Sequence, residues 1–99
     1  MTMAALGYAK LIEELGELAQ VCGKRLAYYT TDDHPDGKGS LRERLESEMA
    51  DVLAAINLVA ENEGLDLGRI NDLSLAKWTK FLVWDEDPDN NREAIDGSG

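Results

Sequence analysis

Two pairs of carboxylates, each with a spacing of three residues, are the side chains of this sequence best suited to chemistry. Glu14 and Glu17 form the first pair, and Glu48 and Asp51 form the second. Residues three apart are neighbours on a helix surface, so each pair can direct its oxygens to one point. Mg²⁺ and Mn²⁺ prefer such oxygen ligands, whereas a set without His or Cys disfavours zinc and copper. Two helices that carry these pairs side by side would form an all-carboxylate cation site.

The apolar residues around each pair place the acids within or beside a buried stripe. At about 100° of rotation per residue, Val52 lies about 40° to one side of Glu48 and Asp51 about 60° to the other. Glu17 lies about 60° from Glu14 in the same sense, so both segments repeat one arrangement. Burying an ionised carboxylate costs several kcal/mol unless it is paired or bound to a cation. The pattern therefore favours a divalent cation between the two segments.

A competing interpretation places these acids on solvated helix faces. In a chain with 30% charged residues, Glu-x-x-Glu and Glu-x-x-Asp occur often without a metal. The acids could also form ion pairs with basic residues, which lie mostly toward the helix ends and could instead meet phosphate: Lys24, Arg25, Arg42 and Arg44. The sequence alone leaves these alternatives open.

The elements that must position the four acids are helical. Apolar residues recur at helical spacing over residues 4–26 and 41–63, and over a shorter segment from 67 or 71 to 84. Ser40 with Glu43 predicts a capping box at the start of the second helix, and Gly64 ends that helix. Residues 27–39, which contain His-Pro-Asp-Gly, predict a loop. We therefore expect an all-α fold of two long antiparallel helices plus a shorter third, completing a four-helix-type bundle by self-association.

Length and charge limit the function further. The chain has 99 residues and a formal net charge of −10, which disfavours binding to nucleic acid or to a membrane surface. A chain this short buries only about 60–65% of its unfolded surface, so a homodimer or homotetramer is expected. Residues 1–84 are expected to form one domain and the acidic residues 85–99 a flexible tail. A single cysteine, Cys22, and no apolar stretch of about 18 residues fit a cytoplasmic protein.

Two strings of this sequence resemble the motifs of a known family. Residues 13–18 (EELGEL) and 48–53 (EMADVL) are similar to the EExxE and ExxD signature of MazG-like, all-α nucleoside triphosphate pyrophosphohydrolases. The resemblance spans about residues 11–81. It implies Mg²⁺, with Mn²⁺ as a possible substitute, and cleavage of a (d)NTP between its α and β phosphates to a monophosphate and pyrophosphate. It assigns metal binding to Glu14, Glu17, Glu48 and Asp51, and catalytic roles to Glu13 and Glu48.

The sequence departs from the family pattern in three places. Ser47 stands where an acid often precedes the ExxD motif, 30 residues separate Glu17 from Glu48, and Trp78 stands where an Asn is often found. Candidate substrate-binding residues are Lys24, Arg42, Lys77, Trp78 and Lys80. Two alternatives remain: a phosphoribosyl-ATP pyrophosphohydrolase-like enzyme, and a non-catalytic acidic helical interaction protein.

Overall fold

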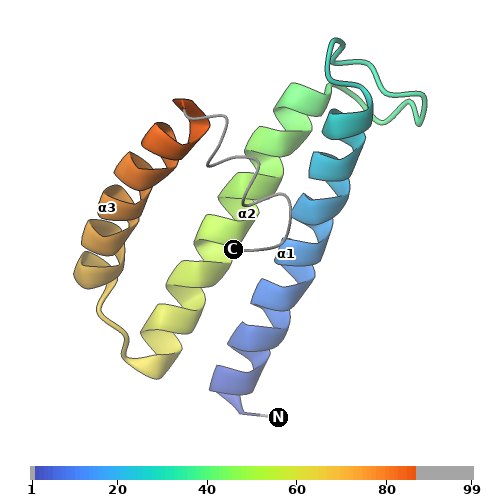
Figure 1. Ribbon diagram of the computed structural model, residues 1–99. Coiled ribbons are helices and arrows are strands. Elements are labelled where there is room, and N and C mark those ends of the chain that lie inside the picture. Colours follow the sequence, from blue (N-terminus) through green and yellow to red (C-terminus); the bar gives the residue numbers. More distant parts are fainter. Residues whose placement is uncertain (1, 87–99) are drawn as a thin grey trace, which may run out of the picture. The chain divides into compact units, whose positions relative to one another are not determined.

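Three α-helices make up the computed structural model, which describes residues 2–86 (Figure 1). Within this range there is no strand, so the expected all-α class is confirmed. The helix ends agree with the expected boundaries to within one residue, except that the third helix runs two residues beyond Trp84. Asp85 and Glu86 are therefore helical, and the rest of the expected tail, 87–99, lies outside the described residues. The helices are α1 (Met3–Ala27), α2 (Leu41–Glu63) and α3 (Leu67–Glu86).

Local signals in the sequence account for the ends of α1 and α2. The Thr2 hydroxyl accepts a hydrogen bond from the Ala5 backbone N–H at the start of α1. The Ser40 hydroxyl accepts one from the Glu43 N–H over 3.3 Å, as the predicted cap requires. Gly64 ends α2 with φ of 66°, a left-handed conformation that glycine adopts without strain.

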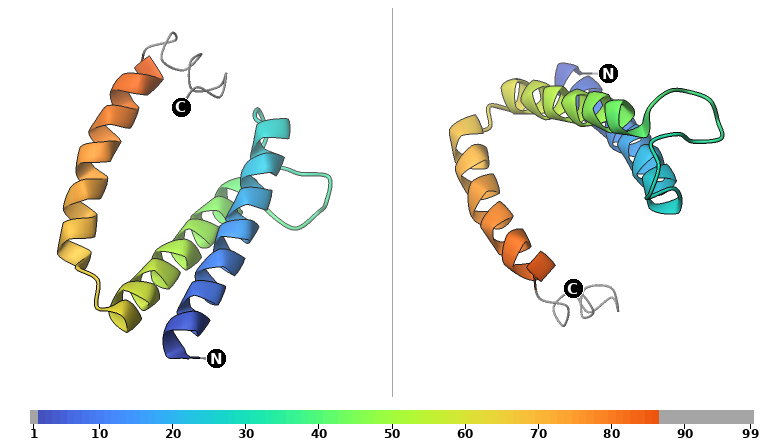
Figure 2. Two further views of the ribbon diagram at one scale, coloured as in Figure 1. Left: turned by 60° about the horizontal axis from the view of Figure 1, so that its bottom comes forward. Right: turned by 90° about the horizontal axis from the view of Figure 1, so that it is seen from above.

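The chain divides at Leu65 into two units, which are described separately. In the first unit, α1 and α2 pack side by side and run antiparallel (Figures 1 and 2). α1 buries a line of residues at seven-residue spacing, Gly7, Glu14 and Val21. A Cβ atom on Gly7 would lie 3.1 Å from Asn62 Nδ2, so the missing side chain permits close approach of the helices. The buried residues of α2 are Leu41, Val52, Ala55, Val59 and Ala60.

The helix pair has two different flanks. Because α1 and α2 are antiparallel, rotation in the same sense from their buried lines leads to the same flank of the pair. One flank, the apolar face, is partly open to solvent, with Leu53 62% exposed. It consists of Leu11, Leu15, Leu18, Leu45, Met49, Leu53 and Ile56. The opposite flank, the polar face, carries Lys10, Glu17, Lys24, Arg44 and Asp51.

The second unit contains α3. Its first turn is capped by Asp66, whose Oδ1 accepts a hydrogen bond from the Arg69 N–H over 3.0 Å. Trp78, Phe81 and Leu82 are each at least half exposed. Among residues 2–86, no helix is both long and apolar enough to cross a membrane.

Candidate metal centre

The packing of α1 against α2 brings the four predicted metal ligands together. One carboxylate oxygen from each side chain can be chosen so that all four atoms lie within 4.8 Å of one another. The antiparallel arrangement explains this convergence, since each helix contributes one acid from its buried line and another from the polar face. We call Glu14, Glu17, Glu48 and Asp51 the carboxylate cluster.

The cluster has a buried inner half and an exposed outer half. Glu14 is only 5% exposed, whereas Glu17 and Asp51 are exposed. The Oε2 atoms of Glu14 and Glu48 are buried and accept no hydrogen bond from the described protein. Buried carboxylate oxygens normally have a partner, since leaving a buried acceptor unsatisfied costs about 1–3 kcal/mol. These two atoms fit the donor set of a hard divalent cation.

Lys10 partly compensates the charge of the cluster. Its Nζ lies 2.9 Å from Glu14 Oε1 and 3.7 Å from Glu13 Oε1. The hydrogen bond to Glu14 and the charge of Glu13 raise the pKa of Lys10 above its usual value. Sequence reasoning missed this cation, although its spacing of four residues from Glu14 is a signal for a helical ion pair.

The remaining repulsion is visible at Glu17. The charge of Glu14, partial desolvation and the charge of Glu48 raise the pKa of Glu17 above its usual range. A field that disfavours a further negative charge favours a positive ion at the same place. The four acids could therefore hold a cation between them.

A shallow cavity of about 350 Å³ adjoins the cluster. Lys10, Glu14 and Asp51 supply its polar wall. Ala54, Ala55 and Leu58, which belong to α2 as Asp51 does, supply the apolar part of its lining. The volume lies within the usual range for small-molecule sites, about 300–1,000 Å³. This cavity could not be predicted from the sequence, because it depends on how α1 packs against α2.

The other candidate residues lie outside the cluster. Glu13 is on α1 with its side chain 58% exposed, and Arg42 is exposed in the first turn of α2. Lys24 lies on the polar face but forms an ion pair with Asp36 over 3.0 Å. The three predicted substrate-binding residues of the second unit, all exposed on α3, are Lys77, Trp78 and Lys80.

Trp78 and Lys80 border an apolar depression on one side of α3, which is lined by Trp78, Lys80, Phe81, Leu82, Trp84 and Asp85.

Comparisons with models of protein families, with curated proteins and with solved structures find no match to this chain.

Proposed function

We propose that this protein is a Mg²⁺-dependent nucleotide pyrophosphohydrolase that cleaves a (d)NTP between the α and β phosphates, releasing a monophosphate and pyrophosphate. The observation that carries the proposal is the pair of buried, unpartnered oxygens of Glu14 and Glu48 inside a cluster of four carboxylates. The reaction class comes from the resemblance of the EELGEL and EMADVL strings to the MazG-like motifs. Geometry supports a cation, and the motifs support a nucleotide.

Each acid has a proposed role that follows from its position. Glu14 and Glu48 hold the cation from the buried side, and Glu17 and Asp51 complete its carboxylate ligands from the polar face. When bound, Mg²⁺ supplies Lewis-acid chemistry: it neutralises charge on phosphate oxygens and lowers the pKa of a bound water. Glu13, one residue before Glu14 and exposed, orients water or ligand at the rim. Glu48 combines metal binding with positioning of the attacking water.

The active form is proposed to be a homodimer or homotetramer. The apolar face supports this, because Leu15, Met49 and Leu53 are each close to half exposed or more on one flank. A second copy that packs there would create a four-helix arrangement and leave the polar face accessible. Contiguous exposed apolar patches of this kind mark association surfaces.

The test is release of pyrophosphate from a panel of ribo- and deoxynucleoside triphosphates and phosphoribosyl-ATP, with Mg²⁺ or Mn²⁺. Glu48→Gln should lower turnover by at least about 100-fold, since it removes a metal ligand. Glu46→Gln is the matched control: it removes the same charge from an exposed position two residues away on α2 and should retain turnover.

Turnover of phosphoribosyl-ATP alone would assign the alternative enzyme class. If no substrate of the panel yields pyrophosphate, or if Glu48→Gln remains active, the proposed activity is wrong. A thermal melt that shows no stabilisation by either cation would favour the acidic interaction protein.

A further inference from the structure

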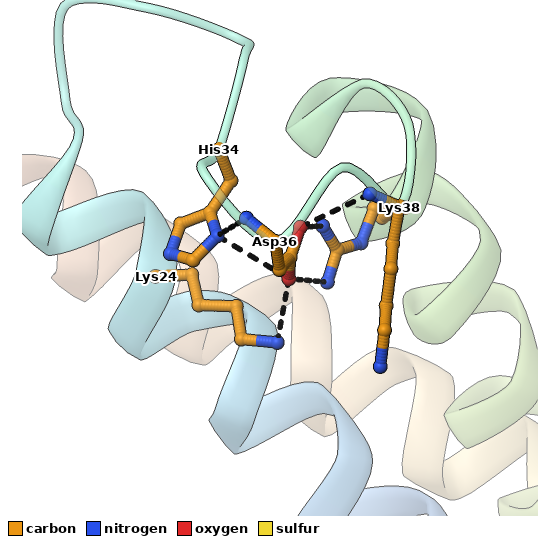
Figure 3. A network of polar contacts seen from close by, with 5 residues as sticks. Lys24, His34, Asp36 and Lys38 are labelled. Atoms are coloured by element: carbon orange, nitrogen blue, oxygen red, sulfur yellow. Dashed lines mark hydrogen bonds and ion pairs between the residues drawn. The ribbon is translucent and has the colours of Figure 1, made fainter.

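The loop between α1 and α2 places a carboxylate between two cations of the polar face. Asp36 Oδ2 lies 3.0 Å from Lys24 Nζ, and the two Asp36 oxygens each accept a hydrogen bond of 3.1 Å from the Arg44 guanidinium. Figure 3 shows the Asp36 carboxylate with Lys24 on one side and the backbone of Lys38 on another. Lys24 comes from α1 and Arg44 from α2, so Asp36 is bound by both helices.

We propose that Lys24 and Arg44 form a phosphate-binding site beside the carboxylate cluster, and that Asp36 occupies it as an internal anion which an incoming phosphate group displaces. The class of ligand is a phosphoanhydride, as in pyrophosphate or the distal phosphates of a nucleotide. The assignment to a nucleotide rests on the proposed function, whereas the anion site rests on the contacts of Asp36.

Charge and geometry at this site suit phosphate as well as a carboxylate. Lys24 and Arg44 carry two positive charges, and the one side chain that they share, Asp36, supplies a single negative charge. The paired hydrogen bonds of Arg44 use the fork geometry by which arginine also binds phosphate. These contacts are also partly shielded, because the Arg44 and Asp36 side chains are less than one-fifth exposed. A dianionic phosphate would compensate both cations.

The site lies in line with the carboxylate cluster. Lys24 follows Glu17 by seven residues, and Arg44 precedes Asp51 by seven, so each cation lies within about 20° of its acid on the same flank. Because α1 and α2 are antiparallel, both cations lie toward the loop. The separation along each helix axis is about 10 Å, and the long Lys and Arg side chains can span part of it. A phosphate chain held by a cation at the cluster would extend toward Lys24 and Arg44.

The base of the loop is fastened independently of Asp36. Arg25 forms an ion pair of 2.7 Å with Asp32 and donates a second hydrogen bond to the Thr31 carbonyl. The Leu41 N–H donates to the Asp32 carbonyl over 2.8 Å. Displacement of Asp36 therefore frees a side chain at the tip, between residues 34 and 38, and leaves the anchoring contacts at the base in place.

The test compares affinity for inorganic pyrophosphate in metal-free buffer by titration calorimetry. Asp36→Asn keeps the size of the side chain but removes the competing charge. If Asp36 occupies the site in about 90% of wild-type molecules, the variant should bind pyrophosphate about tenfold more tightly than wild type. Asp33→Asn removes the same charge from an exposed position of the same loop, away from the contacts of Lys24, Arg44 and Asp36, and should behave as wild type. Adding Arg44→Gln to Asp36→Asn should abolish the gain.

A measurement on the wild-type chain guards against an effect of the variant on folding. In this structure the Lys38 N–H donates a hydrogen bond to Asp36 Oδ1 over 3.1 Å. Pyrophosphate should therefore shift the Lys38 amide and the Arg44 guanidinium resonances in NMR spectra. Equal affinity of wild type and Asp36→Asn, or the absence of these shifts, would overturn the inference.

Repeating the titration with Mn²⁺ and a non-hydrolysable nucleoside triphosphate tests whether the ligand of this site is a nucleotide or free pyrophosphate. The same gain for Asp36→Asn would assign the site to a nucleotide. A gain with pyrophosphate alone would support the anion site with free pyrophosphate as its ligand, even if the proposed hydrolysis fails. Hydrolysis without any effect of Asp36→Asn on pyrophosphate affinity would refute this inference and leave the proposed function standing.

Discussion

Glu14→Gln should be more stable than wild type without metal and less stable than wild type when a divalent cation is added. Glu14 is 5% exposed, its Oε2 has no partner in the described structure, and the other carboxylates of the cluster approach within 4.8 Å. Without metal, the substitution removes a buried charge and provides an N–H that can donate to a neighbouring carboxylate. Relief of an unsatisfied buried acceptor is worth about 1–3 kcal/mol. The lost contact with Lys10 offsets only part of this, because Lys10 is half exposed and screened by solvent.

The net gain for the metal-free variant is therefore about 1–2 kcal/mol of unfolding free energy. At about 4–8 °C per kcal/mol for a domain of this size, the Tm should rise by about 4–16 °C. With cation at 100 times its Kd, wild type gains about 2.7 kcal/mol, because the ion binds only the folded state. The variant has lost a ligand and gains less. Wild type should then melt above Glu14→Gln.

The assay is thermal unfolding followed by circular dichroism at 222 nm, in EDTA and in MnCl₂ or MgCl₂. Glu13→Gln is the matched control, since it makes the same charge change one residue away on a side chain that is 58% exposed. Its Tm should differ little from wild type in both buffers. The reasoning is refuted if Glu14→Gln melts below wild type in EDTA, or if neither cation stabilises wild type.

Three further predictions concern other parts of the first unit. The raised pKa of Glu17 means that the folded state binds a proton at this carboxylate more tightly than the unfolded state does. The free energy of unfolding of the metal-free protein should therefore fall as pH rises from about 4.5 through the raised pKa. Urea titrations should show a smaller fall for Glu17→Gln. Leu53→Glu on the apolar face should lower the mass measured by sedimentation equilibrium, whereas Asn57→Glu on the outer side of α2 should not. Gly16→Ala, with open space around it, should stabilise the fold by about 0.5–1 kcal/mol in chemical denaturation. Gly7→Ala should be less stable than Gly16→Ala, because its Cβ would lie 3.1 Å from Asn62 Nδ2 and the crowding offsets the same gain in helix propensity.

Much of the cluster could be predicted from sequence because it depends on helix periodicity. The positions of Glu14 and Glu48 at the centres of apolar stripes predicted their place at the helix contact, and their neighbours three residues on followed from the same geometry. The boundaries of α2 could also be predicted, because Ser40 and Gly64 begin and end the helix through hydrogen bonds to backbone groups three or four residues away. These features depend on residues close in sequence.

The contacts of Asp36 could not be predicted in the same way. Asp36 lies in a loop, and its partners Lys24 and Arg44 lie on different helices. Their meeting depends on how the loop folds back over the ends of the helix pair, which no periodic pattern encodes. The same limit explains why Lys24 was expected to be available for substrate, although in this structure it is paired.

The carboxylate cluster is divided between two helices, which the loop of residues 28–40 also connects. Neither helix alone offers more than two ligands, so a cation held by all four acids would act as a reversible cross-link between segments that residues 28–40 also join. A single protease cut in this loop would remove the covalent connection and leave the cross-link. The two peptides of the nicked protein, which packing of the buried residues of both helices also holds together, should therefore associate more tightly with Mn²⁺ than in EDTA.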